Sequence, residues 1–74
     1  VEVAVMIVEK DNNTCRVNFR SKGKYIINGI AKSLGGGGHK LAAGAEAQGS
    51  LDEVLQSVLS STRASIEEQN RKII

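Results

Sequence analysis

Six basic side chains lie in a central stretch of the sequence that carries no acidic residue. Between Asp11 and Glu46 there is no aspartate or glutamate, whereas the stretch contains Arg16, Arg20, Lys22, Lys24, Lys32 and Lys40. Acidic residues return after Ser50, so the net charge of the 74 residues is only +2. Segregation of this kind can focus a positive potential on one face of a small fold. The charge pattern therefore makes anion binding a candidate function.

Four consecutive glycines, Gly35 to Gly38, stand directly before His39. Because glycine loses more backbone freedom on folding than any other residue, such a run in a compact domain needs a reason. It could be a flexible loop, a backbone that must approach another group closely, or a nest of N–H groups that binds an anion. Known phosphate loops do not fit, because G-x-G-x-x-G would require glycine at Lys40 or Leu41, and the P-loop pattern does not occur.

An anion bound at this run would need positive charge from side chains. In known phosphate loops the glycines precede a helix, whose N-terminus is partially positive. Here they follow a predicted helix, whose C-terminus is partially negative. The candidate cations are therefore Arg20, Lys22, His39 and Lys40, with the imidazole able to act as a neutral hydrogen-bonding group or as a cation.

Two strands are predicted to precede the glycine run. Val1 to Val8 has apolar residues in both alternating sets, which indicates a central strand covered on both faces, by helices or by a second domain. A polar turn follows at Lys10 to Asn13. From Thr14 to Ser21 the alternation is clean. Cys15, Val17 and Phe19 face one side as core residues, whereas Arg16, Asn18 and Arg20 face the other, where solvent exposure is the simplest interpretation for Arg16 and Asn18.

The remaining sequence predicts a helix, a strand and a second helix. Ile26 to Leu34 places its apolar residues on one helical stripe, with Asn28 as N-cap and Gly35 as the residue that ends the helix. Leu41 to Ala47 predicts a short strand of small residues. The last helix begins at an S-x-x-E capping box and continues to about Gln69, while residues 70–74 are expected to fray. Its box is Ser50 and Glu53, and its stripe is Leu51, Val54, Leu55, Val58, Leu59, Thr62 and Ile66.

The predicted order β-β-α-β-α indicates an α/β (α+β) fold in which two helices cover a small mixed sheet. Residues 1–74 are expected to form a single domain. One cysteine excludes an internal disulfide, and with a single histidine the chain cannot build a zinc site of soft ligands. No apolar run approaches the roughly 20 residues that span a bilayer, and no charged and apolar leader opens the sequence. An intracellular, reducing compartment is expected.

The residues Arg20-Ser21, a short helix, and then Gly35 to Gly44 (GGGGHKLAAG) resemble the DHHA1 domain, the C-terminal half of DHH-family phosphoesterases. The sequence of these motifs is most similar to that of the nanoRNase type, which degrades very short RNA oligonucleotides and dephosphorylates 3′-phosphoadenosine 5′-phosphate (pAp). The resemblance covers about Val3 to Asn70. Lys40 stands where family members often have proline, so the loop exit is expected to be less rigid.

The resemblance implies a substrate-binding role. The family's Arg-Ser pair falls on Arg20 and Ser21, and its glycine motif falls on Gly36, Gly37, Gly38 and His39, which would contact the nucleotide and its phosphate. A separate N-terminal DHH domain of the same chain would hold two manganese ions. The implied ligands are short RNA or nucleotide phosphates, the implied location is the cytoplasm without membrane attachment, and a homodimer of the full-length protein is among the implied assemblies.

The composition agrees with binding without cleavage. Two-metal hydrolysis needs clustered carboxylates or histidines, whereas residues 12–45 contain no carboxylate and the chain has one histidine. No catalytic or metal residue is therefore predicted, and the isolated domain is expected to be inactive.

Three alternatives stay open. The domain could serve a cyclic-dinucleotide phosphodiesterase, it could be a non-enzymatic module that binds single-stranded RNA, or its glycines could only permit tight packing in a structural domain. Base stacking on several aromatic rings is typical of strand-binding modules. Phe19 and Tyr25 are the only aromatic residues, and Phe19 is predicted to be buried. This shortage of aromatic residues favours binding of only one or two nucleotides.

Overall fold

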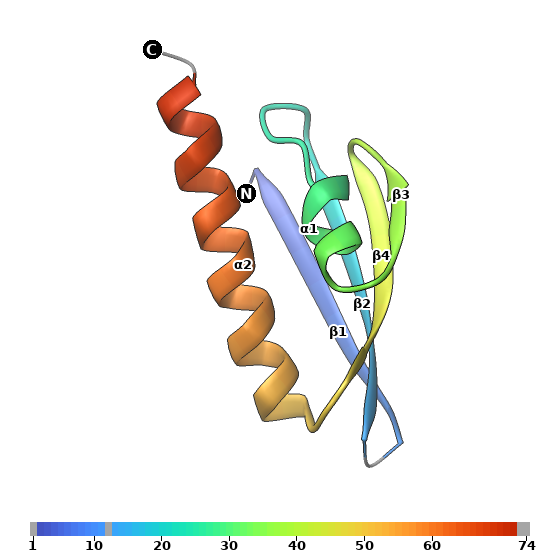
Figure 1. Ribbon diagram of the computed structural model, residues 1–74. Helices are drawn as coiled ribbons and strands as arrows, with labels where there is room; N and C mark the ends of the chain where they lie inside the picture. The colour runs from blue at the N-terminus through green and yellow to red at the C-terminus, as the bar shows by residue number, and fades with distance from the viewer. Residues whose placement is uncertain (1, 12, 73–74) are drawn as a thin grey trace.

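One four-stranded sheet and two helices make up the structure, a computed structural model that describes residues 2–11 and 13–72 (Figure 1). The elements are β1 (Val3–Asp11), β2 (Thr14–Ser21), α1 (Asn28–Ser33), β3 (Gly37–His39), β4 (Ala42–Gln48) and α2 (Leu51–Lys72). The strand order is β1-β2-β4-β3, and every neighbouring pair is antiparallel. Of the helices in the described residues, none is long and apolar enough to cross a membrane.

The predicted α/β class, a small sheet covered by two helices, is confirmed, but the sheet has one strand more than expected. The second half of the glycine run forms β3, so the order is β-β-α-β-β-α, and the sheet is antiparallel, not mixed. Gly37 pairs with Gly44, and His39 pairs with Ala42. Glycine has no side chain and leaves no alternating pattern, which is why the sequence did not indicate this strand.

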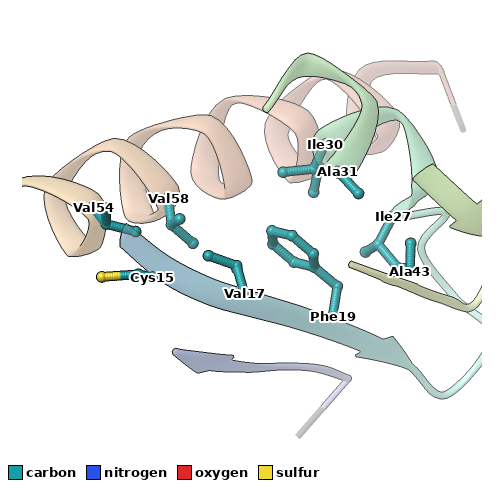
Figure 2. Close-up of a cluster of buried hydrophobic side chains, with 9 residues drawn as sticks. All are labelled: Cys15, Val17, Phe19, Ile27, Ile30, Ala31, Ala43, Val54 and Val58. Atoms are coloured by element: carbon teal, nitrogen blue, oxygen red, sulfur yellow. The ribbon is translucent and has the colours of Figure 1, made fainter. Parts of the chain in front are cut away.

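The core lies between β2 and the two helices, which occupy the same face of the sheet (Figure 2). The predicted inward set of β2 is fully buried, since Cys15, Val17 and Phe19 have no exposed surface. Against them pack Ile27, Ile30 and Ala31 at α1, Ala43 of β4, and Val54 and Val58 of α2. Burial raises the pKa of the Cys15 thiol, and Glu9 and Asp11 raise it further.

The first strand differs from its prediction as a central strand covered on both faces. β1 lies at an edge of the sheet. Val3, Val5 and Ile7 pack against the core, whereas Met6 and Val8 are 59% and 49% exposed. Because only one face of the sheet carries helices, the second apolar set of this strand is left uncovered. Val1 and Asn12, which belong to the predicted strand and turn, lie outside the described residues.

Gly35 ends α1 as predicted, whereas the predicted N-cap is one position off. Ile27 precedes the first helical residue, Asn28, and no side chain caps that end. At the other end Gly35 has φ +90° and donates its N–H to the Lys32 carbonyl at 3.0 Å, and Gly36 donates to the Ala31 carbonyl at 2.9 Å. This pair of bonds is the Schellman motif, in which a left-handed residue satisfies the last helical carbonyls.

The capping box of α2 is present as predicted. The Ser50 N–H donates to Glu53 Oε1 at 3.0 Å, and the Glu53 N–H donates to Ser50 Oγ at 3.2 Å. The apolar stripe is only partly buried, since Leu51, Leu55 and Leu59 are 41%, 38% and 47% exposed. The helix thus buries a narrower face than its sequence suggested, because it packs along one side of a narrow sheet.

The end of α2 is ordered further than predicted. The expected fraying of residues 70–74 does not apply to 70–72, which are helical, while Ile73 and Ile74 lie outside the described residues. The side chain of Gln69 donates to the Ile26 carbonyl and accepts from the Ile26 N–H, both at 2.8 Å. Tyr25 Oη donates to Asn70 Oδ1 at 2.9 Å. These bonds attach the segment before α1 to the last turns of α2.

Candidate nucleotide-binding site on the open face of the sheet

The face of the sheet away from the helices carries the polar set of β2. Residues that pair across antiparallel strands point to the same side. Arg20 pairs with Ala42, which pairs with His39 of β3, so these three residues form one row across the open face. The next row contains Asn18, Gly44 and Gly37. Long polar side chains of β2 therefore stand beside a floor of alanine and glycine.

This arrangement forms a shallow cavity of about 240 Å³. The cavity is smaller than the roughly 300–1,000 Å³ of sites that enclose a drug-sized ligand, so it suits a phosphate group and part of a nucleotide. It contains three residues that the sequence singled out, Arg20, Gly37 and Gly38. The lining consists of Arg16, Asn18, Arg20, Gly37, Gly38, Ala42, Ala43 and Gly44.

The first half of the glycine run does not supply a nest of free N–H groups. The N–H groups of Gly35 and Gly36 are bound to carbonyls of α1. Instead, the glycines permit close approach, which was the other interpretation of the run. A Cβ at Gly36 would lie 2.1 Å from the Gly44 carbonyl oxygen, and one at Gly38, where φ is +144°, would lie 2.7 Å from Ala43 Cα. A side chain at either position would push β3 away from β4.

Gly37 is the one member of the run for which the fold shows no requirement. Its φ is not positive, and a Cβ placed on it would have no described atom within 4 Å. It lines the cavity on the open face, in the row of Asn18 and Gly44. β3 is also an edge strand, and edge strands keep part of their backbone donors and acceptors unpaired by the sheet. A ligand could therefore lie directly against this backbone.

The guanidinium groups on the open face are available to a ligand. Arg16 and Arg20 are exposed, and within residues 2–11 and 13–72 no hydrogen bond or ion pair reaches either guanidinium group. The carboxylate on this face, Glu46, is bound by Lys10. That hydrogen bond and the charge of Lys10 lower the pKa of Glu46, and the positive charge of Arg16 lowers it further. The acid is thus neutralised by a residue outside the cavity.

Three predicted site residues do not line the cavity. Ser21 follows Arg20 in the strand and so points to the opposite face, where its hydroxyl accepts the Gly23 N–H at 3.2 Å. Gly36 serves the end of α1. His39 is exposed on the open face, one strand beyond Ala42, which puts its backbone roughly 10 Å from that of Arg20. Its side chain can reach the cavity only from the rim.

The other candidate cations and Tyr25 are not among the residues that line the cavity. Lys22, Lys24 and Lys40 are exposed. The turn at Lys40 is anchored by its backbone, because the Lys40 carbonyl accepts the Ile27 N–H and the Leu41 carbonyl accepts the Ser21 N–H, both at 2.9 Å. Tyr25 is 7% exposed and has Lys24 Nζ 5.4 Å from its ring centroid. It is a packing residue and offers no ring for base stacking.

The donor set does not fit a manganese centre. In the part of the chain that the structure describes, no three histidine, cysteine, aspartate or glutamate side chains come together. A pair of metal ions about 3.5–4 Å apart needs several such ligands. This face instead presents guanidinium and backbone groups, which are able to bind phosphate.

Sequence reasoning missed five cavity residues. It treated Arg16 and Asn18 as solvated, and it saw Ala42, Ala43 and Gly44 only as small residues of a strand. The usable signal was the pair Ala42 and Gly44, two small residues on the same face of the strand, beside the polar face of β2. A larger hollow of about 530 Å³ lies between residues 23–29 and the end of α2, but the lining includes only one basic residue, Lys24, together with Glu68.

Comparison with known proteins identifies the family of this chain. Residues 1–68 match the DHHA1 domain family. The chain is 56% identical over 41 residues, 55% of its length, to the bifunctional oligoribonuclease and PAP phosphatase NrnA of Bacillus subtilis. It is 39% identical over 62 residues, 82% of its length, to the protein of the same name from Thermus thermophilus. These matches cover 12% and 19% of the relatives, so the chain spans less than a fifth of their length. The match over residues 1–68 shows that the chain belongs to the DHHA1 domain family.

Proposed function

We propose that this domain binds the terminal phosphate and nucleotide of short oligoribonucleotides or nucleotide phosphates and orients them for hydrolysis by a DHH domain. The names of the two relatives, an oligoribonuclease and PAP phosphatase, support this substrate class. Orientation of a substrate contributes several kcal/mol to catalysis, because it removes translational and rotational freedom before the reaction. A domain without catalytic residues can therefore carry a large part of an enzyme's rate.

One observation carries the proposal: Arg20, Gly37 and Gly38 line the same cavity. An unpaired guanidinium group can bind phosphate through two parallel hydrogen bonds. A backbone without side chains lets a sugar or phosphate approach closely. Gly37 is the decisive member, because neither its φ nor its neighbours explain a glycine there. A purely structural role for the run does not account for this position.

The aromatic residues disfavour a module that binds extended single-stranded RNA. Such modules stack successive bases on exposed rings. Phe19 has no exposed surface, and Tyr25 is buried with its hydroxyl bound to Asn70. Neither of these two rings is therefore placed to receive a base. The cyclic-dinucleotide alternative has no observation of its own in favour of it.

Within residues 2–11 and 13–72 no cluster of metal-binding side chains occurs, so we assign the reaction itself to another domain. We propose that the DHH domain of a full-length protein supplies two manganese ions, and that the complete enzyme works in the cytoplasm. The metal ions would activate the attacking water and stabilise charge on the scissile phosphate. The contribution of this domain is to hold the substrate with Arg20 and the backbone at Gly37 and Gly38. The 74-residue chain alone should show no manganese-dependent phosphoesterase activity.

A titration with pAp tests the proposal. Arg20→Ala should weaken binding by about 1.5–3 kcal/mol, the range for hydrogen bonds to charged groups. Lys24→Ala removes an exposed charge away from the cavity and should change the affinity little. Isothermal titration calorimetry of the three proteins decides the matter. Equal losses for the two variants would show that only net charge matters, and no loss for Arg20→Ala would refute the site.

A further inference from the structure

Arg16 is a second arginine in the same cavity, and the position of its guanidinium group is defined by Gly44. A Cβ at Gly44 would lie 3.2 Å from Arg16 Nη2 and 2.8 Å from Asn18 Oδ1. Both side chains therefore lean from β2 across β4, over the glycine. The absence of a side chain at Gly44 leaves the space that they occupy.

The position of Arg16 is not explained by an ion pair. Its cross-strand neighbour is Glu46, the residue that would normally attract it. Glu46 is bound by Lys10 of β1, and in the described residues the Arg16 guanidinium group has no hydrogen bond or ion pair. A cation that lies over a cavity floor while the nearby acid is held by another residue is available to an anionic ligand.

The spacing of the two arginines lets them contact different groups of one ligand. Arg16 and Arg20 are four residues apart on one strand, which separates their backbones by roughly 13 Å at about 3.3 Å per residue. Arg16 leans into the row of Asn18 and Gly44, which is two residues, or roughly 7 Å, from the row of Arg20. Each guanidinium group can bind one phosphate in a bidentate contact, so the pair can hold two phosphates of one ligand.

We propose that Arg16 and Asn18 form a second phosphate subsite over Gly44, so that the site recognises ligands with two phosphates separated by a ribose. The inference rests on the proposed function, because Arg20 provides the first subsite. Both pAp and an oligonucleotide with a 5′-phosphate present such a pair. A ligand with one phosphate fills only one subsite.

The test compares pAp with AMP, which has the same base and sugar but one phosphate fewer. The wild-type chain should bind pAp about tenfold more tightly than AMP at low ionic strength, as expected for one additional charge-assisted contact. Arg16→Gln should remove most of this preference and change the affinity for AMP by no more than about twofold, since AMP can use the remaining subsite. Arg63→Gln, an exposed arginine on α2, is the matched control and should keep the preference.

A second variant keeps every charge. Gly44→Ala introduces a methyl group where Asn18 and Arg16 now lie, so their side chains must move. It should reduce the preference for pAp as Arg16→Gln does. Amide spectra of each variant verify that the fold is intact, and Asn18→Ala provides the same test if Gly44→Ala unfolds.

The results separate the two proposals. If Arg16→Gln lowers the affinity for pAp and AMP by the same factor, or changes neither, the second subsite is refuted while the first stands. If Arg20→Gln leaves both affinities unchanged, the proposed function itself fails. Loss of the pAp preference in Arg16→Gln, with retained AMP binding and a normal Arg63→Gln control, supports the second subsite.

Discussion

The two faces of β2 have different surroundings, although their residues alternate along one strand. Phe19 is fully buried in the core (Figure 2). The next residue, Arg20, is exposed and lines the cavity. Contacts on the covered face stabilise the fold. On the open face, the guanidinium groups of Arg16 and Arg20 have no hydrogen bond or ion pair with other described residues. If the proposed function holds, stability and ligand binding depend on alternate positions, and a change on one face should leave the other property nearly unaffected.

The largest expected effect comes from the covered face. Phe19→Ala should lower the free energy of unfolding by about 3–5 kcal/mol, because it removes a large buried side chain and leaves a cavity. That loss is a large part of the stability of a small domain. Urea unfolding followed by circular dichroism measures it. Arg20→Ala is the control on the open face and should stay within about 0.5 kcal/mol of the wild type. Equal losses would contradict the division between the faces.

The four glycines of the run likewise differ in whether they are required by the packing of the fold. Gly36→Ala would place a methyl group 2.1 Å from the Gly44 carbonyl oxygen, so β3 must shift. We expect a loss of about 1–3 kcal/mol or more in the free energy of unfolding, as for other overpacked sites. Gly29→Ala is a matched control, because its Cβ would meet no described atom and alanine favours a helix. If thermal unfolding shows that Gly36→Ala is no less stable than Gly29→Ala, the close approach at Gly36 is not required.

Gly37→Ala should weaken pAp binding and leave the stability nearly unchanged, unlike Gly36→Ala. A Cβ there meets no described atom within 4 Å and φ is not positive, so stability should change by less than about 0.5 kcal/mol. The methyl group would enter the cavity and should weaken pAp binding by about 1 kcal/mol through steric conflict with the ligand. Calorimetric titration together with urea unfolding separates the two quantities. A variant that unfolds but binds normally when folded would place Gly37 with the structural glycines.

A smaller effect concerns the Lys10–Glu46 pair. Because the hydrogen bond and charge of Lys10 hold the pKa of Glu46 below its ordinary value of 4.5, this carboxylate stabilises the folded state above that pH. The contribution should disappear as the pH falls through the lowered pKa. Lys10→Met should therefore reduce the stability slightly at pH 7 and not at pH 2–3, which urea titrations at the two pH values can detect. A constant difference between the proteins at both pH values would argue against the pair.

How far the sequence predicted this structure depends on whether a signal was local. The Ser50–Glu53 capping box and the glycine that ends α1 need only neighbouring residues, and both are present. The alternation of β2 correctly separated Phe19 from Arg20. β3 was missed because a strand of glycines is defined by its pairing with β4, a contact that leaves no pattern in side chains. The edge position of β1 and the exposed leucines of α2 also depend on packing between distant segments.

The candidate site was predictable in part for the same reason. Arg20 could be linked to the glycine run through family resemblance, and the structure places both at one cavity. The role of Gly44, and with it the orientation of Arg16, follows from the register between β2 and β4, which the sequence alone did not contain. Ser21 was predicted as a site residue together with Arg20. As the next residue of the strand, however, it faces the opposite side of the sheet from Arg20.

The most direct test of the account is an amide chemical-shift titration of the 74-residue chain with pAp. We expect the largest changes at Arg20, Gly37, Gly38 and His39, with smaller changes at Gly44. The account would be contradicted if pAp shifted residues 23–29 and 65–69, around the larger hollow beside α2, and left the amides of Arg20 and the glycine strand unchanged.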